Sequence, residues 1–458
     1  MTSKPNTGAM TALQQIDSRP LTKNQKNLIS LAVVGNISEF FDMFLIGFAV
    51  SSLLKDPNWT LHGFEAGIIL AMSGLGTVLG AILWGRLADK IGRKASFFWC
   101  VLLFTVFTLA CVLTPDNGWV LLAILRVLVG IGVGGLNIVS IPYVQEFVPA
   151  KQRGLLAGLT AVFIPVGLFL GSVAQIATGD NWRLLIGLGG IPIFLLLWLR
   201  MVPESPRYLQ SQGRTDEARK ALAWALELPA DQIGALPEIT HAASASYSLI
   251  FRKYLKALVI VTLGSFCFIF GSSVIQSWGQ SILSSGFEFN AQMVGGLFMV
   301  VSLGDLLGRL SSAWLADKIG RRWVMLSYGL LGALGLLIAA GSVAITTSAG
   351  WEPTTAGWVF FAGILIAMVF GDGAFGVLNP FGAEQFPNEA RATGLGLGYG
   401  LGASAKVFGP VMLGMMFGEK VTLESIPPAF MFFAALLVIG GVTYMFAQET
   451  KGRSLDSI

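Results

Sequence analysis

Long apolar runs separated by short polar intervals make up most of the chain. Each run reaches the roughly 20 residues that an α-helix needs to cross the hydrocarbon core of a bilayer. In chain order the runs cover residues 28–53, 64–84, 95–114, 119–143, 154–178 and 184–202, and then 257–284, 291–314, 323–346, 355–379, 393–417 and 427–447. The pattern therefore predicts an all-α membrane protein with twelve transmembrane helices.

A longer polar interval divides these helices into two sets of six. It contains a charged helical stretch at Thr215–Leu228, and we expect it to form short helices that link two bundles rather than a catalytic domain. The predicted organisation is an N-terminal tail (1–27), a first six-helix bundle (28–202), the linker (203–256), a second bundle (257–447) and a C-terminal tail (448–458).

Composition agrees with the apolar pattern. Hydrophobic residues make up 54% of the chain and charged residues only 12%, about half of the roughly 25% that is usual in soluble domains. The 56 glycines fit membrane helices, in which small side chains let backbones approach closely. Soluble globular, nucleic-acid-binding, fibrous and disordered classes are therefore excluded.

Lysine and arginine are unevenly distributed among the loops. The loops after the even helices and the tails collect Arg86, Lys90, Arg93, Lys94, Lys151, Arg153, Arg207, Arg214, Lys318, Arg321, Arg322, Arg391, Lys451 and Arg453. The opposite loops contain little beyond Lys55, Arg183 and Lys420. Because basic loops stay in the cytoplasm, this bias predicts that both termini and the linker are cytoplasmic.

The two halves repeat a charged loop. The segment Gly85–Lys94 recurs as Ala313–Arg322, with Leu-Ala-Asp-Lys-Ile-Gly-Arg in both copies. Glu146, followed seven residues later by Arg153, recurs as Glu384 followed by Arg391. Two six-helix halves around a midplane site are typical of transporters.

These loops, with Pro203–Arg207 and the terminal Glu449–Arg453, resemble the major facilitator superfamily, in its sugar-porter and organic-ion branches. The resemblance covers nearly the whole chain and implies a clamp on the cytoplasmic side in the outward-open state. The implied clamp consists of Asp89, Arg93, Glu146, Arg153, Glu204, Asp317, Arg321, Glu384, Arg391 and Glu449. The alternative is that the basic residues only set topology, which leaves the repeated acids unexplained.

A few charged residues lie inside the apolar runs, where charges are costly and indicate function by default. Glu39 and Asp42 share one face of the first helix, and two carboxylates close together are suited to proton exchange. In the proton-coupled sugar porters that the chain resembles, an Asp at the position of Asp42 faces an Arg at the position of Arg126. The alternative is a static buried ion pair that fixes helix packing.

The second half contains three further intramembrane charges. Asp305 and Arg309 are four residues apart and we expect them to neutralise each other structurally. Lys406 lies in the small-residue segment Gly402–Pro410, without an acidic neighbour within a helical turn. In organic-ion transporters this position resembles the one that matches substrate charge, so a lysine there implies a carboxylate substrate. The alternative is that Lys406 pairs with Glu39 or Asp42.

Polar and aromatic side chains complete the predicted substrate site. Gln276 and Gln280 lie one helical turn apart and offer neutral donors and acceptors. The proposed substrate contacts are Lys406, Gln276, Gln280, Trp278, Phe375, Asn379 and Phe44. The Gln-Gln pair and Gly-Ile-Asn pattern of sugar porters are missing here, which weakens a sugar assignment.

The sequence as a whole predicts a secondary transporter that imports a small organic anion by proton-coupled alternating access. The chain resembles bacterial niacin porters, which suggests nicotinate as substrate and the bacterial inner membrane as location. Alternatives are a sugar or polyol proton symporter and a non-transporting nutrient sensor of the same fold. We expect no enzymatic activity, cofactor or metal, no nucleic-acid partner, and a monomer in the lipid bilayer.

Overall fold

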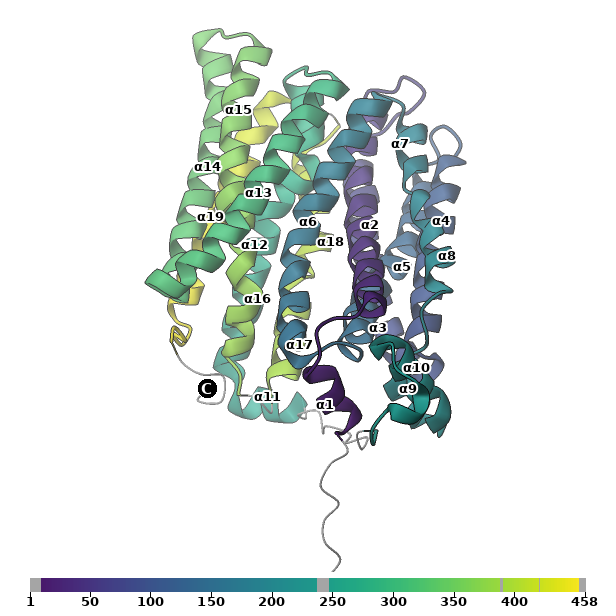
Figure 1. The fold of residues 1–458 in the computed structure, drawn as a ribbon. Coiled ribbons are helices and arrows are strands. Elements are labelled where there is room, and N and C mark those ends of the chain that lie inside the picture. Colours follow the sequence, from purple (N-terminus) through teal and green to yellow (C-terminus); the bar gives the residue numbers. More distant parts are fainter. Residues whose placement is uncertain (1–9, 237–246, 388–389, 420, 453–458) are drawn as a thin grey trace, which may run out of the picture.

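The computed structural model describes residues 10–236, 247–387, 390–419 and 421–452, without the side chains of 137, 150–158, 160, 161, 347 and 392. These described residues form helices and no strand, in two bundles that stand side by side (Figure 1). Eleven described helical segments are long and apolar enough to cross a membrane, and the shorter apolar stretch Val162–Thr178 accounts for the twelfth predicted crossing.

The first bundle contains α2 (Lys23–Leu53), α3 (Gly63–Ile91), α4 (Arg93–Val112), α5 (Trp119–Gln145), α6 (Ala150–Thr178) and a sixth segment made of α7 (Trp182–Leu188), η1 (Ile191–Phe194) and α8 (Leu195–Leu199). The second contains α12 (Leu255–Ser281) continued by η3 (Ile282–Gly286), α13 (Ala291–Ile319), α14 (Arg321–Ala349), α15 (Pro353–Ala367) with η4 (Met368–Asp372) and α16 (Phe375–Glu384), α17 (Arg391–Gly402) with α18 (Ala405–Phe417), and α19 (Ile426–Met445).

Several of the predicted continuous helices are interrupted. The sixth segment breaks between α7 and α8, where Gly189 and Gly190 are weak helix formers and Pro192 lacks a backbone N–H. The tenth contains the π-helical turn η4, a feature that is frequent at functional sites. The eleventh breaks at Ala403 and Ser404, directly before Lys406.

The short helices gather at the end of the molecule where the chain termini lie, which we call the charged end (Figure 1). They are α1 (Ala12–Asp17), α9 (Pro206–Ser211), α10 (Thr215–Leu226), η2 (Ala230–Gln232) and α11 (Tyr247–Lys253). Helix α10 occupies most of the predicted stretch Thr215–Leu228, and ends at Glu227 in the left-handed conformation. At the other extremity, the opposite end, lies η5 (Leu423–Ser425).

Glycines bring the helices into close contact. A Cβ atom on Gly134 of α5 would lie only 2.1 Å from the carbonyl oxygen of Thr77 in α3, so the two backbones touch inside the first bundle. Between the halves, a Cβ on Gly67 of α3 would lie 2.7 Å from the carbonyl oxygen of Pro410 in α18. Such contacts require small residues because packing, not the hydrophobic effect, associates helices in lipid.

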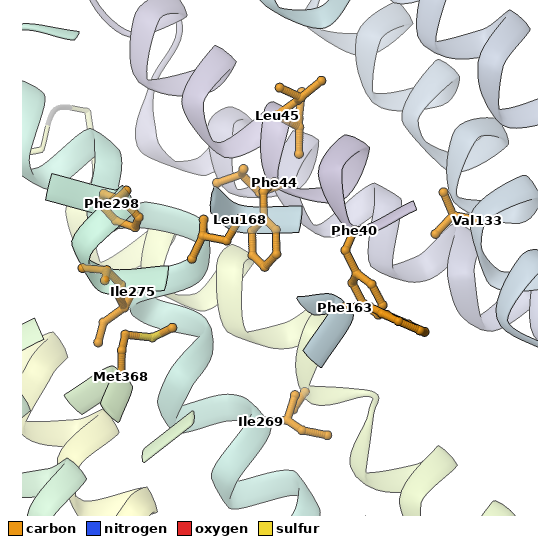
Figure 2. Close-up of a cluster of buried hydrophobic side chains, with 14 of the residues drawn as sticks. Phe40, Phe44, Leu45, Val133, Phe163, Leu168, Ile269, Ile275, Phe298 and Met368 are labelled. Atoms are coloured by element: carbon orange, nitrogen blue, oxygen red, sulfur yellow. The ribbon is translucent and has the colours of Figure 1, made fainter. Parts of the chain in front are cut away.

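The two halves are held together at the opposite end. There, within the described part of the chain, Lys55 donates to the carbonyl of Phe289 at 3.3 Å and the Gly63 N–H donates to Gly418 at 2.9 Å. The halves also meet in an apolar layer, in which Phe44 and Leu168 face Phe298 and Ile275 (Figure 2).

Candidate functional site

At the charged end of the first half, Arg93 joins two acids. Its guanidinium lies 2.9 Å from Asp89, one turn back on α3, and 3.8 Å from Glu146 at the end of α5. Glu204, from the loop before α9, accepts hydrogen bonds of 2.9 Å from the backbone N–H groups of Arg93 and Lys94. Glu204 thus caps the N-terminus of α4, where a negative charge is favoured.

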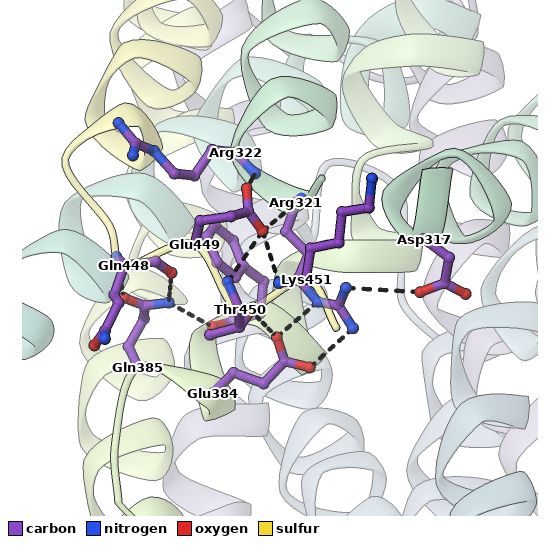
Figure 3. Close-up of polar contacts among 10 residues, drawn as sticks. Asp317, Arg321, Arg322, Glu384, Gln385, Gln448, Glu449, Thr450 and Lys451 are labelled. Carbon is purple, nitrogen blue, oxygen red and sulfur yellow. Dashed lines mark hydrogen bonds and ion pairs between the residues drawn. The ribbon is translucent and has the colours of Figure 1, made fainter. Parts of the chain in front are cut away.

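The second half has the same kinds of contact between the corresponding residues (Figure 3). Arg321 lies 3.6 Å from Asp317 and 2.7 Å from Glu384. Glu449, just after α19, accepts from the backbone N–H groups of Arg321 and Arg322 at 3.1 Å each. The sequence repeat therefore corresponds to a structural repeat in which one acid caps a helix and two others flank an arginine.

Each network belongs to its own half. No hydrogen bond or ion pair within the described residues links the first network to the second. The Arg153 side chain lies outside the described residues, and Arg391 is partly buried at the start of α17. The structure thus brings together eight of the ten predicted clamp residues, four in each half, with contacts that tie the helices of one bundle to each other.

The pKa shifts in opposite directions in Glu146, which flanks Arg93, and in Glu449, which caps α14. Burial raises the pKa of Glu146, against the opposing effects of the Ser205 hydroxyl and Arg93. For Glu449, partial burial opposes ionisation, but hydrogen bonds from the surrounding backbone N–H groups outweigh it and lower the pKa.

Inside the first bundle, Asp42 and Arg126 form the ion pair that the resemblance implies. Asp42 Oδ2 lies 3.2 Å from an Arg126 Nη atom, and both side chains are 1% exposed. The Thr108 hydroxyl donates to Asp42 Oδ1 at 2.8 Å, and Arg126 Nε donates to Ser73 at 2.8 Å. The two charges therefore neutralise each other away from solvent, and each side chain also makes one hydrogen bond to a hydroxyl group.

Glu39 lies one turn before Asp42 on α2 and is equally buried. Lys406, partly buried at the start of α18, attracts Glu39 electrostatically across the boundary between the halves. A methyl group on Gly74 of α3 would lie 3.1 Å from the Lys406 carbonyl oxygen, so this boundary is closely packed. Of the two acids considered as partners for Lys406, Asp42 is already engaged by Arg126.

Inside the second bundle, Arg309 bridges two acids. Its Nε lies 2.8 Å from Asp305 one turn earlier, and its Nη2 contacts Asp372 in η4. Gln276 of α12 donates to Asp372 Oδ1 at 2.8 Å. The expected pairing of Asp305 with Arg309 is confirmed, but Asp372 was missed by the sequence reasoning, although an acid within the apolar run 355–379 is a visible signal.

The other predicted substrate residues separate into two groups. Gln276 and Asn379 are partly buried, and Phe375 lies against Arg309 with its ring centroid 5.4 Å from the guanidinium carbon. Gln280, Trp278 and Phe44 are almost fully buried, at 0%, 0% and 3% exposure.

Trp278 makes packing contacts with a neighbouring helix. Its indole N–H donates to the carbonyl of Pro410 at 3.1 Å, and its ring packs edge-on against Phe417 at 5.1 Å. Proline at 410 leaves the carbonyl four residues earlier without its helical donor, while the indole satisfies the Pro410 carbonyl itself. Trp278 therefore holds α12 against α18.

The described residues contain no group of three His, Cys, Asp or Glu side chains that could bind a metal ion. The described buried ion pairs lie in two places, at Asp42 and Arg126 in the first bundle and around Arg309 in the second. Charges inside membrane-spanning segments are costly and indicate functional positions by default.

Known proteins match over the full length of the bundles. A family profile described as "Sugar (and other) transporter" matches residues 28–458. The niacin transporter NiaP of Acinetobacter baylyi is 28% identical, covering 98% of this chain and 100% of its own. The putative niacin/nicotinamide transporter NiaP of Bacillus subtilis is 27% identical, covering 94% and 98%. The xylose transporter XylE from E. coli, in a partially occluded inward open conformation, superposes with a TM-score of 0.71 at 21% identity, covering 94% and 100%.

Proposed function

Since the chain belongs to the sugar (and other) transporter family of the major facilitator superfamily, we propose that it imports a small organic anion by proton-coupled alternating access. As a multi-pass membrane transporter of this family it is not an enzyme. Nicotinate is the first candidate substrate, because it combines one carboxylate with a flat ring.

Lys406 is the observation that carries the anion assignment. Its ammonium group is partly buried at the boundary between the halves, and it is the only basic side chain among the described intramembrane candidates without an ion pair within 4.0 Å. Arg126 and Arg309, by contrast, are already paired. A carboxylate that reaches Lys406 gains a charge-assisted hydrogen bond.

The names of the relatives agree with this proposal. Two of them are described as niacin transporters, although their identity to this chain is below 30%. The sugar or polyol symporter remains the second candidate, supported by the structural likeness to a xylose transporter and by the acids at Glu204 and Glu449 that the resemblance to sugar porters emphasises.

The sidedness belongs to the proposal as well. We place the charged end in the cytoplasm, by the bias of lysine and arginine toward it. The contacts between the halves then close the outer side, and the two charged networks stand apart on the inner side. In the outward-open state the halves approach each other there, so the networks become a clamp only when they meet.

Uptake into proteoliposomes tests the substrate and the coupling together. We expect labelled nicotinate to accumulate faster when the outside is acidic, and unlabelled nicotinate, but not xylose, to compete. Lys406→Gln is expected to lose binding at least about tenfold, the equivalent of a net charged hydrogen bond of about 1.5–3 kcal/mol, whereas Lys406→Arg keeps the charge and retains part of it. Xylose uptake without nicotinate uptake would instead establish the second candidate.

A further inference from the structure

The buried charges balance in one ion-pair cluster and not in another. Asp42 and Arg126 form one acid against one base in the first half. In the cluster around Arg309 of the second half, two acids share one base. With all three groups ionised, the cluster of Asp305, Arg309 and Asp372 carries one uncompensated negative charge.

This excess charge is fully enclosed. Asp305 is 0% exposed, Asp372 1% and Arg309 3%. Removing a charge from water without a partner costs several kcal/mol, so a buried group that lacks a counter-charge changes its protonation state instead. Binding of a single proton makes the cluster neutral.

The contacts indicate where the proton resides. Asp372 accepts hydrogen bonds from both Arg309 and Gln276, which stabilise its ionised form. Asp305 Oδ1 accepts a hydrogen bond from Arg309 Nε, and its Oδ2 is buried without a hydrogen-bond partner. Both carboxyl groups contact the same Arg309 guanidinium, so a proton on Asp305 removes the repulsion between two like charges held at one base.

We propose that Asp305, Arg309 and Asp372 form a proton-binding site of the second half, in which one proton is held on Asp305 Oδ2. Release takes the proton from that O–H bond to water and leaves a carboxylate. The role in coupling rests on the transport function proposed above, whereas the bound proton itself does not.

The surroundings of the site contain a route for coupling. Besides its own charges, the site meets Gln276 from α12 and the ring of Phe375 from α16. Tyr328 of α14 packs against the ring of Phe370 in η4, with the ring centroids 5.3 Å apart. Gln276 lies where α12 meets α2, because a Cβ on Gly47 would be 3.5 Å from its carbonyl oxygen. When a substrate engages the Gln276 amide, Asp372 loses a donor and binds the proton more strongly.

The geometry of η4 supports a functional role for this acid. The π-helical turn Met368–Asp372 inserts an extra residue into the tenth segment and ends on Asp372. Its backbone is pressed against α13, where Ser312 donates to the Gly373 carbonyl at 2.7 Å. The turn therefore holds the Asp372 carboxyl group against Arg309 rather than continuing the regular helix.

Infrared spectroscopy of the full chain in proteoliposomes tests the proton without any substrate. At neutral pH we expect the carbonyl stretch of a protonated carboxylic acid, shifted by exchange into D₂O. Asp305→Asn and Asp372→Asn each leave one acid against one base, so both are expected to lose the intensity of one such group. Asp317→Asn, an exposed acid at the charged end, is the matched control and keeps it.

Opposite changes are expected when the base is removed. Arg309→Gln leaves two buried acids without a counter-charge, so the acid signal should increase. Loss of intensity in either aspartate variant supports the site, and wild-type intensity in both overturns it. Because no substrate is present, failure of nicotinate uptake leaves this result standing. The coupling role is checked separately, by the loss in Asp305→Asn of the acceleration of uptake by a proton gradient; unchanged acceleration would refute that role alone.

Discussion

Removing the charge of Asp42 should destabilise the first bundle strongly. In Asp42→Asn the guanidinium of Arg126 stays buried at 1% exposure without its counter-ion. At the observed 3.2 Å and an effective dielectric constant of about 20, the lost Coulomb attraction is about 5 kcal/mol. This agrees with the roughly 3–5 kcal/mol found when one partner of a buried pair is removed.

The loss is largely electrostatic because asparagine keeps the shape and a carbonyl acceptor for Thr108. A double-mutant cycle of Asp42→Asn and Arg126→Gln, measured by unfolding in mixed micelles, separates the pair from its surroundings. We expect each single change to raise the equilibrium constant of unfolding by about two to three and a half orders of magnitude. The double change is expected to cost much less than the sum, because no charge is then left unpaired.

The chain contains a matched control for this experiment. Asp116 and Arg183 form an ion pair of similar length, 3.0 Å, but with side chains 59% and 37% exposed. Solvent-exposed pairs contribute about 0–1 kcal/mol, so Asp116→Asn should be nearly neutral. If Asp42→Asn is no more costly than Asp116→Asn and the cycle is additive, the buried pair does not stabilise the bundle as argued.

Three further predictions concern packing, capping and anchoring. Gly134→Ala should cost about 1–3 kcal/mol, because its new methyl group meets the α3 backbone, whereas Gly400→Ala, with open space around it, should be neutral or slightly stabilising in the same unfolding assay. The pKa of Glu449 is lowered in the folded protein, so its ionised carboxylate stabilises the fold fully above the unfolded pKa of about 4.3. This stabilisation is lost as the pH falls through the lower folded pKa. The thermal midpoint of Glu449→Gln should therefore fall less between about pH 5 and pH 3 than the midpoint of the wild type. Trp278→Phe should cost about 1–3 kcal/mol by leaving a buried carbonyl unpaired, and equal thermal midpoints would remove its anchoring role.

Much of the architecture was predictable because it depends on local composition. Apolar runs of sufficient length predict the crossing helices, since the bilayer requires every backbone polar group to be satisfied within its segment. The repeated spacing of Asp89 and Arg93, and of Asp317 and Arg321, places each pair one helical turn apart in any helix. These features need no knowledge of which helices are neighbours.

The candidate site was predictable only in part. Helical periodicity shows that Gln276, Trp278 and Gln280 are near each other, but not which of them faces a neighbouring helix. Trp278, for example, donates its indole N–H to the carbonyl of Pro410 on α18. Asp372 was overlooked because its partner Arg309 lies on a different helix, and its position depends on a π-helical turn that the apolar pattern does not reveal.

The sequence by itself therefore determined the membrane class, the twelve crossings, the duplicated halves and the residues at which charge enters the bilayer. Only the tertiary structure decided that Asp372 of the tenth segment joins the pair of Asp305 and Arg309 on α13. The physical reason is distance. Membership of a helix follows from neighbours along the chain, whereas the balance of buried charge depends on groups within about 4 Å in space, and these come from different helices.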